Sequence, residues 1–138
     1  MDLSGINLAE IIVAAISTFA VGFFWYGDIL FGKAWRSLSG ISEEKAQSGH
    51  MPLIFGGSFL LNLIIAAALS IFTEVAMMLG TSALYAGLMA FLLCFVFVAT
   101  TFGINYLFAQ KPLKLYLIDV GYMFVSFFIM GLIVGAWY

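Results

Sequence analysis

Charged residues divide this chain into long uncharged runs. The stretch between Glu10 and Asp28 holds 17 uncharged residues, and the stretch between His50 and Glu74 holds 23. From residue 75 to residue 110 no charge occurs for 36 residues. About 20 residues cross the roughly 30 Å of hydrocarbon in a bilayer. The first two runs therefore fit one crossing each, and the third is too long for a single crossing.

Turn-forming residues set the remaining boundaries. Gly80-Thr81-Ser82 can form a short outer loop at 74–82, and Lys111-Pro112-Leu113-Lys114 interrupts the chain again. We therefore predict an all-α fold in one integral membrane domain, a four-transmembrane-helix bundle made of two helical hairpins. The predicted helices cover about residues 7–27, 52–73, 83–109 and 115–137, joined after the first by an amphipathic connection at 28–50.

Composition supports a membrane protein and narrows the range of partners. The chain is 64% hydrophobic and 9% charged, whereas a soluble domain is about 25% charged and 45–50% apolar. Membrane lipids are therefore expected partners. The net charge is −2 and no basic tract is present, so nucleic acid is not an expected partner.

The basic residues predict an orientation. Lys33, Arg36 and Lys45 lie in the first connection, Lys111 and Lys114 lie in the third, and no other Lys or Arg occurs. The positive-inside rule then places the 28–50 and 110–114 connections in the cytoplasm and both termini outside. We expect a multi-pass protein of the inner (plasma) membrane.

The first connection carries aromatic residues at its start. Trp25, Tyr26 and Trp35 are predicted to anchor this stretch at the membrane–water interface, with Lys33 on the water side. Ser42 precedes two acidic residues and is typical of a helix N-cap. Apolar residues at helical spacing could form the buried side of an interfacial helix: Ile29, Leu30, Phe31, Ala34, Trp35 and Leu38.

Several stretches of this sequence resemble a small bacterial membrane family, domain of unknown function 1761. The resemblance implies a four-helix membrane protein and brings no established activity. It is carried by the Trp25-Tyr26-Gly27 and Leu30-Phe31-Gly32-Lys33-Ala34-Trp35 strings, by residues 107–116, by Asp119-Val120-Gly121-Tyr122 and by residues 131–137.

Polar residues inside the predicted helices are candidates for a binding cluster, because such residues are costly in hydrocarbon and face a partner or a cavity. At 1.5 Å per residue, Asp119 and Asn105 lie roughly 7 Å inside the loop charges. Ser58 is at similar depth, and Asn62 and Ser126 lie nearer the midplane. The candidate cluster is Asp119, Asn105, Asn62, Tyr122, Ser126 and Ser58.

Asp119 admits two interpretations. In the functional one, it is a proton or cation site partnered by Asn105 and a tyrosine hydroxyl. In the structural one, it is a shallow carboxylate that pairs with Lys111 or Lys114 and fixes the hairpin. The midplane hydroxyl groups are likewise open to two interpretations, because they can bond between helices or back to their own helix as well as line a path.

Small residues predict close helix contacts. Gly131 and Gly135 lie on the face of the last helix opposite Asp119, Tyr122 and Ser126, and Gly22 lies on the first helix. Because these faces need covering, we expect a homo-oligomer.

The sequence offers little catalytic chemistry. His50 and Cys94 are the single histidine and cysteine, which gives no zinc ligand set, no haem pair and no Cys-His dyad. We therefore assign no catalytic residue, no metal ligand and no cofactor, and the sequence leans against an enzyme without deciding it. Glu10 and Glu74 are interpreted as acidic caps at the outer face.

Three functions remain open from the sequence. The leading hypothesis is the binding or passage of a small molecule or ion at an inter-helix or oligomer cleft, with Asp119, Asn105 and Asn62 as polar contacts. The alternative is a structural or lipid-interacting protein without transport. A membrane oxidoreductase is less favoured, since metal and quinone ligands are missing from the sequence.

Overall fold

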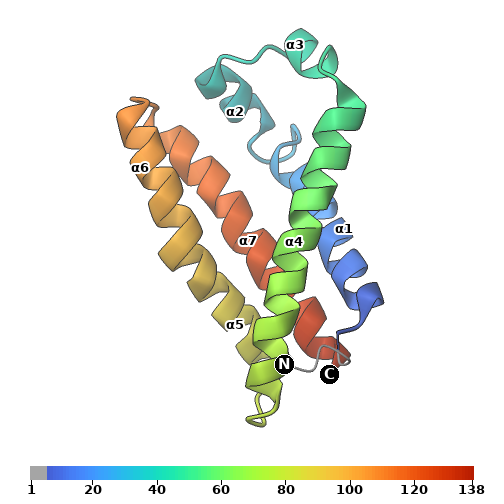
Figure 1. Cartoon of the computed structure of the whole chain (residues 1–138). Coiled ribbons are helices and arrows are strands. Elements are labelled where there is room, and N and C mark those ends of the chain that lie inside the picture. Colours follow the sequence, from blue (N-terminus) through green and yellow to red (C-terminus); the bar gives the residue numbers. More distant parts are fainter. Residues whose placement is uncertain (1–5) are drawn as a thin grey trace.

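The computed structural model describes residues 6–138, and every regular element in this range is helical. Four helical segments are long and apolar enough to cross a membrane, so the chain is a multi-pass membrane protein of the predicted all-α class. Three of them are single helices, and the third along the chain combines α5, a π-helix (η1) and α6 (Figure 1). The elements are α1 (Leu8–Trp25), α2 (Gly32–Ser39), α3 (Glu43–Gln47), α4 (Met51–Met77), α5 (Ala83–Leu93), η1 (Cys94–Ala99), α6 (Thr100–Phe108) and α7 (Leu113–Trp137).

Side chains next to the helix starts cap the first turns. Ser42 accepts a hydrogen bond from the Lys45 amide at 3.1 Å, which confirms the predicted N-cap of α3. His50, the last residue of the predicted 28–50 connection, caps α4 by accepting from the Leu53 amide at 3.1 Å. The helix α4 continues past Glu74 to Met77, so the following loop is shorter than the sequence suggested.

Helix α7 is the central element, because it contacts α1, α4 and α5 (Figure 1). Gly131 and Gly135 lie against α5: a Cβ atom at Gly131 would lie 2.7 Å from both the Ala86 carbonyl oxygen and the Ala90 Cβ. On the other side, a Cβ atom at Gly22 would meet the Tyr122 ring at 3.5 Å. The small-residue faces are therefore covered within one chain. Self-association stays a prediction and needs another surface.

An apolar cluster fills the bundle toward the end where α1 begins and α7 ends. Its buried members come from α1, α4, α5 and α7: Ile11, Ala14, Ala66, Leu69, Ala90, Met130 and Val134. Beside it, Glu10 is only 1% exposed and accepts a hydrogen bond from the buried Ser70 hydroxyl. Glu10 thus lies in the first turn of α1, where the sequence placed an acidic residue, but its side chain is covered by α4 and not exposed at the surface.

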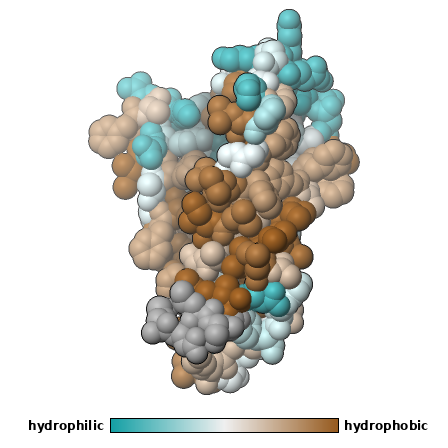
Figure 2. Space-filling view, turned by 45° about the vertical axis from the view of Figure 1, so that its right-hand side comes forward, coloured by the Kyte–Doolittle hydropathy of each residue, from teal (hydrophilic) through white to brown (hydrophobic). Residues whose placement is uncertain are grey.

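The two ends of the molecule differ. A hydrophobic surface covers its middle, and hydrophilic residues gather at the end formed by α2 and α3 (Figure 2). At that end the ribbons of α4 and α6 diverge, whereas α4 and α5 approach one another at the opposite end (Figure 1). The helices are therefore more widely separated at the α2–α3 end than at the opposite end.

The close contact between α5 and α7 gives the first testable prediction. Gly131→Ala should destabilise the protein by about 1–3 kcal/mol, because the added methyl group meets backbone and side-chain atoms that leave no room for it. Gly56→Ala is the matched control, since a Cβ atom at Gly56 in α4 has nothing within 4 Å. Thermal unfolding of the purified variants in detergent measures the difference. Equal stability of the two variants would contradict the packing described here.

Candidate functional site

The Asp119 carboxylate is the meeting point of four segments. On its Oδ1 atom it accepts a hydrogen bond from the Tyr26 hydroxyl at 2.7 Å and one from the Trp35 indole N–H at 3.1 Å. On Oδ2 it accepts from the Tyr106 hydroxyl. The donors come from the end of α1, from α2 and from α6, while Asp119 lies on α7. This carboxylate therefore ties the α2–α3 end of the bundle together.

A tight turn after α1 brings Trp35 to Asp119. The Gly32 amide donates to the Gly27 carbonyl at 2.9 Å, and the Phe31 amide donates to the Trp25 carbonyl at 3.0 Å. Gly32 is buried, and a Cβ atom there would lie 2.5 Å from the Tyr26 carbonyl oxygen. Only glycine fits at this position, so α2 begins close under the end of α1.

The aromatic residues predicted as interfacial anchors turn into the protein. Tyr26 and Trp35 donate to Asp119, and the Trp25 indole N–H donates to the Ile118 carbonyl at 2.8 Å. All three aromatic side chains are half-buried, while Lys33 is exposed. Their N–H and O–H groups bond to polar atoms of α7. Their position at the membrane–water interface stays a prediction.

The predicted partners of Asp119 are not the ones found. Asn105 is exposed, and its amide donates to the Thr101 carbonyl of its own helix at 3.3 Å. Between residues 6 and 138 the only ion pair joins Arg36 to Asp28, so Lys111 and Lys114 do not pair with Asp119. Lys111 instead lies over the Tyr106 ring, 4.8 Å from its centroid. Of the predicted partners, only a tyrosine hydroxyl contacts Asp119: the hydroxyls of Tyr26 and Tyr106 both donate to it.

A cleft of about 450 Å³ lies between α4, α7 and the η1–α6 segment, and we call it the α4–α7 cleft. It brings together four of the six residues in the predicted cluster: Ser58, Asn62, Tyr122 and Ser126. Asp119 and Asn105 lie outside it. The other lining side chains are apolar: Leu61, Ile65, Val98, Phe102, Met123, Phe127 and Met130.

The polar groups of the cleft have few partners in the protein. Ser126 is 3% exposed, and its hydroxyl has no hydrogen-bond partner among the described residues. In the same part of the chain, no hydrogen bond uses the side chains of Ser58 or Asn62. Tyr122 donates to the Thr18 carbonyl of α1 at 3.2 Å. The cleft thus presents free hydrogen-bonding groups within an apolar lining.

A π-helix borders this cleft and was missed by the sequence analysis. Three of its carbonyl groups accept hydrogen bonds from side-chain hydroxyls. Thr100 donates to the Val96 carbonyl at 2.5 Å, Thr101 to the Phe97 carbonyl at 2.6 Å, and Tyr116 to the Ala99 carbonyl at 2.8 Å. Single-turn π segments are often found at functional sites. The one sequence signal near this segment is the adjacent pair Thr100-Thr101, whose hydroxyls both bond back to their own helix.

The described residues offer no site for a metal ion of the usual kind. No group of three or more His, Cys, Asp or Glu side chains is placed to hold one within residues 6–138. Cys94 is buried, and His50 caps α4. The chemistry of the two sites is therefore that of hydrogen bonds, one carboxylate and aromatic rings.

Comparison with known proteins gives one match. The model of the family described as "Protein of unknown function (DUF1761)" matches residues 9–135, which is nearly the whole chain. No curated protein and no solved structure matches the sequence.

The contacts of Asp119 predict that α2 is held in place by the Trp35 indole. Trp35→Phe keeps an aromatic ring but removes a hydrogen bond to a carboxylate, an interaction typically worth about 1.5–3 kcal/mol. Backbone amides of α2 should then exchange hydrogen about tenfold faster or more, while those of α5 and α7 stay unchanged. Hydrogen exchange followed by mass spectrometry measures this. Trp137→Phe, at the opposite end of the bundle, serves as control. Equal protection of the α2 amides in both variants would contradict the prediction that Trp35 holds α2 in place.

Proposed function

We propose that this chain, which belongs to the DUF1761 family, binds an amphipathic small molecule from the bilayer in the α4–α7 cleft. The observation that carries the proposal is the buried, unpartnered hydroxyl of Ser126 in a cleft that also contains Asn62 and Ser58. The ligand has an apolar body and one polar group, such as a hydroxyl or a carbonyl, that pairs with these side chains.

The unpartnered polar group and the size of the cleft support this ligand class. A buried polar group without a partner costs about 1–3 kcal/mol, and a polar group of a ligand would remove that cost. The volume of about 450 Å³ lies within the roughly 300–1,000 Å³ of small-molecule sites, which are mostly apolar with a few polar groups. The bilayer supplies molecules of this kind at high local concentration.

Binding is favoured over passage through the bundle. Met130 lines the cleft and also belongs to the apolar cluster, in which Ala14, Ala66 and Val134 are fully buried. None of the cluster members offers a polar side chain that could replace the hydration shell of a crossing ion. The cleft is therefore proposed as a binding site that ends at the apolar cluster.

The polar contacts of the cleft can be tested separately from its shape. Without added ligand, Ser126→Ala should leave the protein as stable as before or more stable, because it removes an unpartnered hydroxyl. The same change should weaken ligand binding, and Asn62→Leu should weaken it too. Asn105→Leu is the control, since Asn105 lies outside the cleft.

Photolabelling provides the measurement. The probe is a long-chain alcohol with a diazirine group next to its hydroxyl, added to the protein in lipid vesicles. Labels are expected on cleft residues such as Val98, Phe102 and Met123, with several-fold lower yield in the Ser126 and Asn62 variants. The opposite result is uniform labelling of all lipid-facing residues that these variants do not change. It would support the structural or lipid-interacting alternative and overturn the binding proposal.

We also propose that the protein lies in the inner (plasma) membrane and that its α2–α3 end faces the cytoplasm. All five Lys and Arg residues lie in the two connections at this end, between α1 and α4 and around the α6–α7 turn. The C-terminus would then lie outside.

Reporter fusions at Tyr138 test this orientation. A C-terminal alkaline phosphatase should be active and a C-terminal green fluorescent protein dark, because the first needs the outer side and the second the cytoplasm. The same pair fused after Gln47 should give the opposite result and serves as control. An inverted pattern would reverse the proposed orientation.

A further inference from the structure

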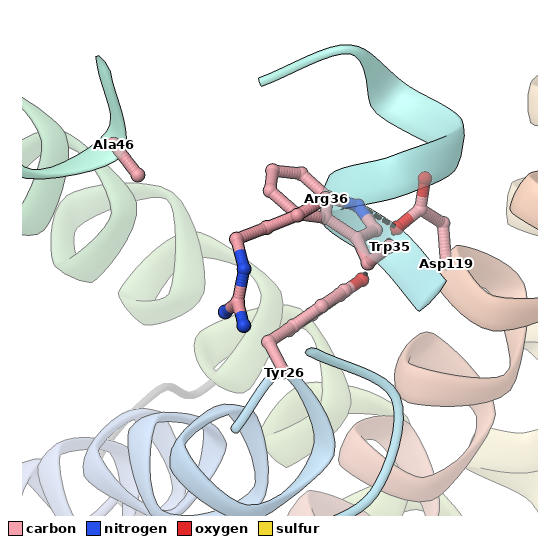
Figure 3. Close-up of a pocket in the computed structure, with 5 residues that line it drawn as sticks. All are labelled: Tyr26, Trp35, Arg36, Ala46 and Asp119. Atoms are coloured by element: carbon pink, nitrogen blue, oxygen red, sulfur yellow. Dashed lines mark hydrogen bonds between the residues drawn. The ribbon is translucent and has the colours of Figure 1, made fainter. Parts of the chain in front are cut away.

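A second cavity of about 330 Å³ lies next to Asp119, at the α2–α3 end of the bundle. Its walls are formed by Tyr26, Trp35, Arg36, Ala46 and Asp119 (Figure 3), and we call it the Asp119 cavity. We propose that it binds a small organic cation, in which an ammonium group lies between the Asp119 carboxylate and the rings of Tyr26 and Trp35.

The first argument is charge. The three groups that donate to Asp119 are two phenol hydroxyls and one indole N–H, all neutral, so they orient the carboxylate without neutralising it. No Lys or Arg within the described range lies within ion-pair distance of it. A carboxylate within a membrane-spanning helix normally pairs with an opposite charge or marks a binding site. Here the cavity offers the place for such a charge.

Arg36 does not supply this positive charge, although its side chain lines the same cavity. Its guanidinium donates to Asp28 at 2.6 Å, and Figure 3 shows its side chain directed away from Asp119. This pairing holds the pKa of the Asp28 carboxyl below its ordinary value, so Asp28 stays ionised and balances Arg36. The unbalanced charge at the cavity wall is that of Asp119.

The second argument is the aromatic wall. The Tyr26 and Trp35 rings meet edge to face, with centroids 5.7 Å apart and planes at 71°. A cation over the face of such rings is attracted by their quadrupole, and this mode is the one used to recognise ammonium groups. A hard ion such as Ca²⁺ needs six or more oxygen ligands. A single carboxylate among aromatic rings therefore favours an organic cation.

This inference does not rest on the function proposed for the α4–α7 cleft. The two cavities share no lining residue, although the rings of Tyr26 and Tyr122, one from each wall, lie in contact with centroids 5.2 Å apart and planes tilted at 54°. Loss of binding in one of them can be measured while the other is intact.

Titration of the purified protein in lipid nanodiscs with tetramethylammonium chloride tests the proposal, with sodium chloride at equal concentration as the baseline. Calorimetry should give saturable binding to the unchanged chain. Asp119→Asn should weaken it about tenfold or more, because it removes the charge that attracts the cation. Glu44→Gln, which removes an exposed carboxylate from α3 outside the cavity, should bind as the unchanged chain does.

A pair of variants at Tyr26 keeps the test informative if Asp119→Asn does not fold. Tyr26→Phe retains the ring and should keep most of the affinity, whereas Tyr26→Leu should lose it. The methyl protons of bound tetramethylammonium should shift upfield in nuclear magnetic resonance spectra, because they lie over ring faces. Absence of binding to the unchanged chain, equal binding by Asp119→Asn, or binding of inorganic phosphate that Arg36→Gln removes would overturn the proposal.

Discussion

A carboxylate in a membrane-spanning helix must find its partners within the protein, and Asp119 finds them in three separate segments. A partly buried carboxylate oxygen that lacks a hydrogen-bond partner costs free energy, so these three donors stabilise the fold. The geometry of the α2–α3 end follows from this requirement. The chain must reverse after Trp25, α2 must lie under the end of α1, and α6 must stay close to α7.

The opposite end depends on close packing rather than on polar contacts. Gly131 and Gly135 allow α7 to approach α5, and buried alanines from α1 and α4 complete a thin apolar cluster. In lipid, such van der Waals contact is a main source of helix association, because burying apolar surface gains little there. The bundle is therefore narrow at one end and held open at the other, and the two cavities lie toward the open end.

The α4–α7 cleft follows from this combination. Ser58 and Asn62 lie in the half of α4 nearer α2 and α3, and Ser126 lies one turn of α7 beyond Tyr122. The π-helix places Val98 in the same cleft. The Thr100 and Thr101 hydroxyls donate additional hydrogen bonds to carbonyl groups of this helix. Local irregularity, polar groups without partners and an apolar lining thus coincide at one location.

The sequence by itself determined the all-α class of the protein and its four apolar helices. The spacing of the charges limits the length of each apolar helix, and the fixed rise of 1.5 Å per residue gives each polar residue a position along its helix axis. It did not determine which polar groups meet. Asn105 and Asp119 share a depth but not a contact, Glu10 is buried, and Trp35 turns inward, because rotation about each helix axis is decided by packing against its neighbours. Only the tertiary structure contains that information.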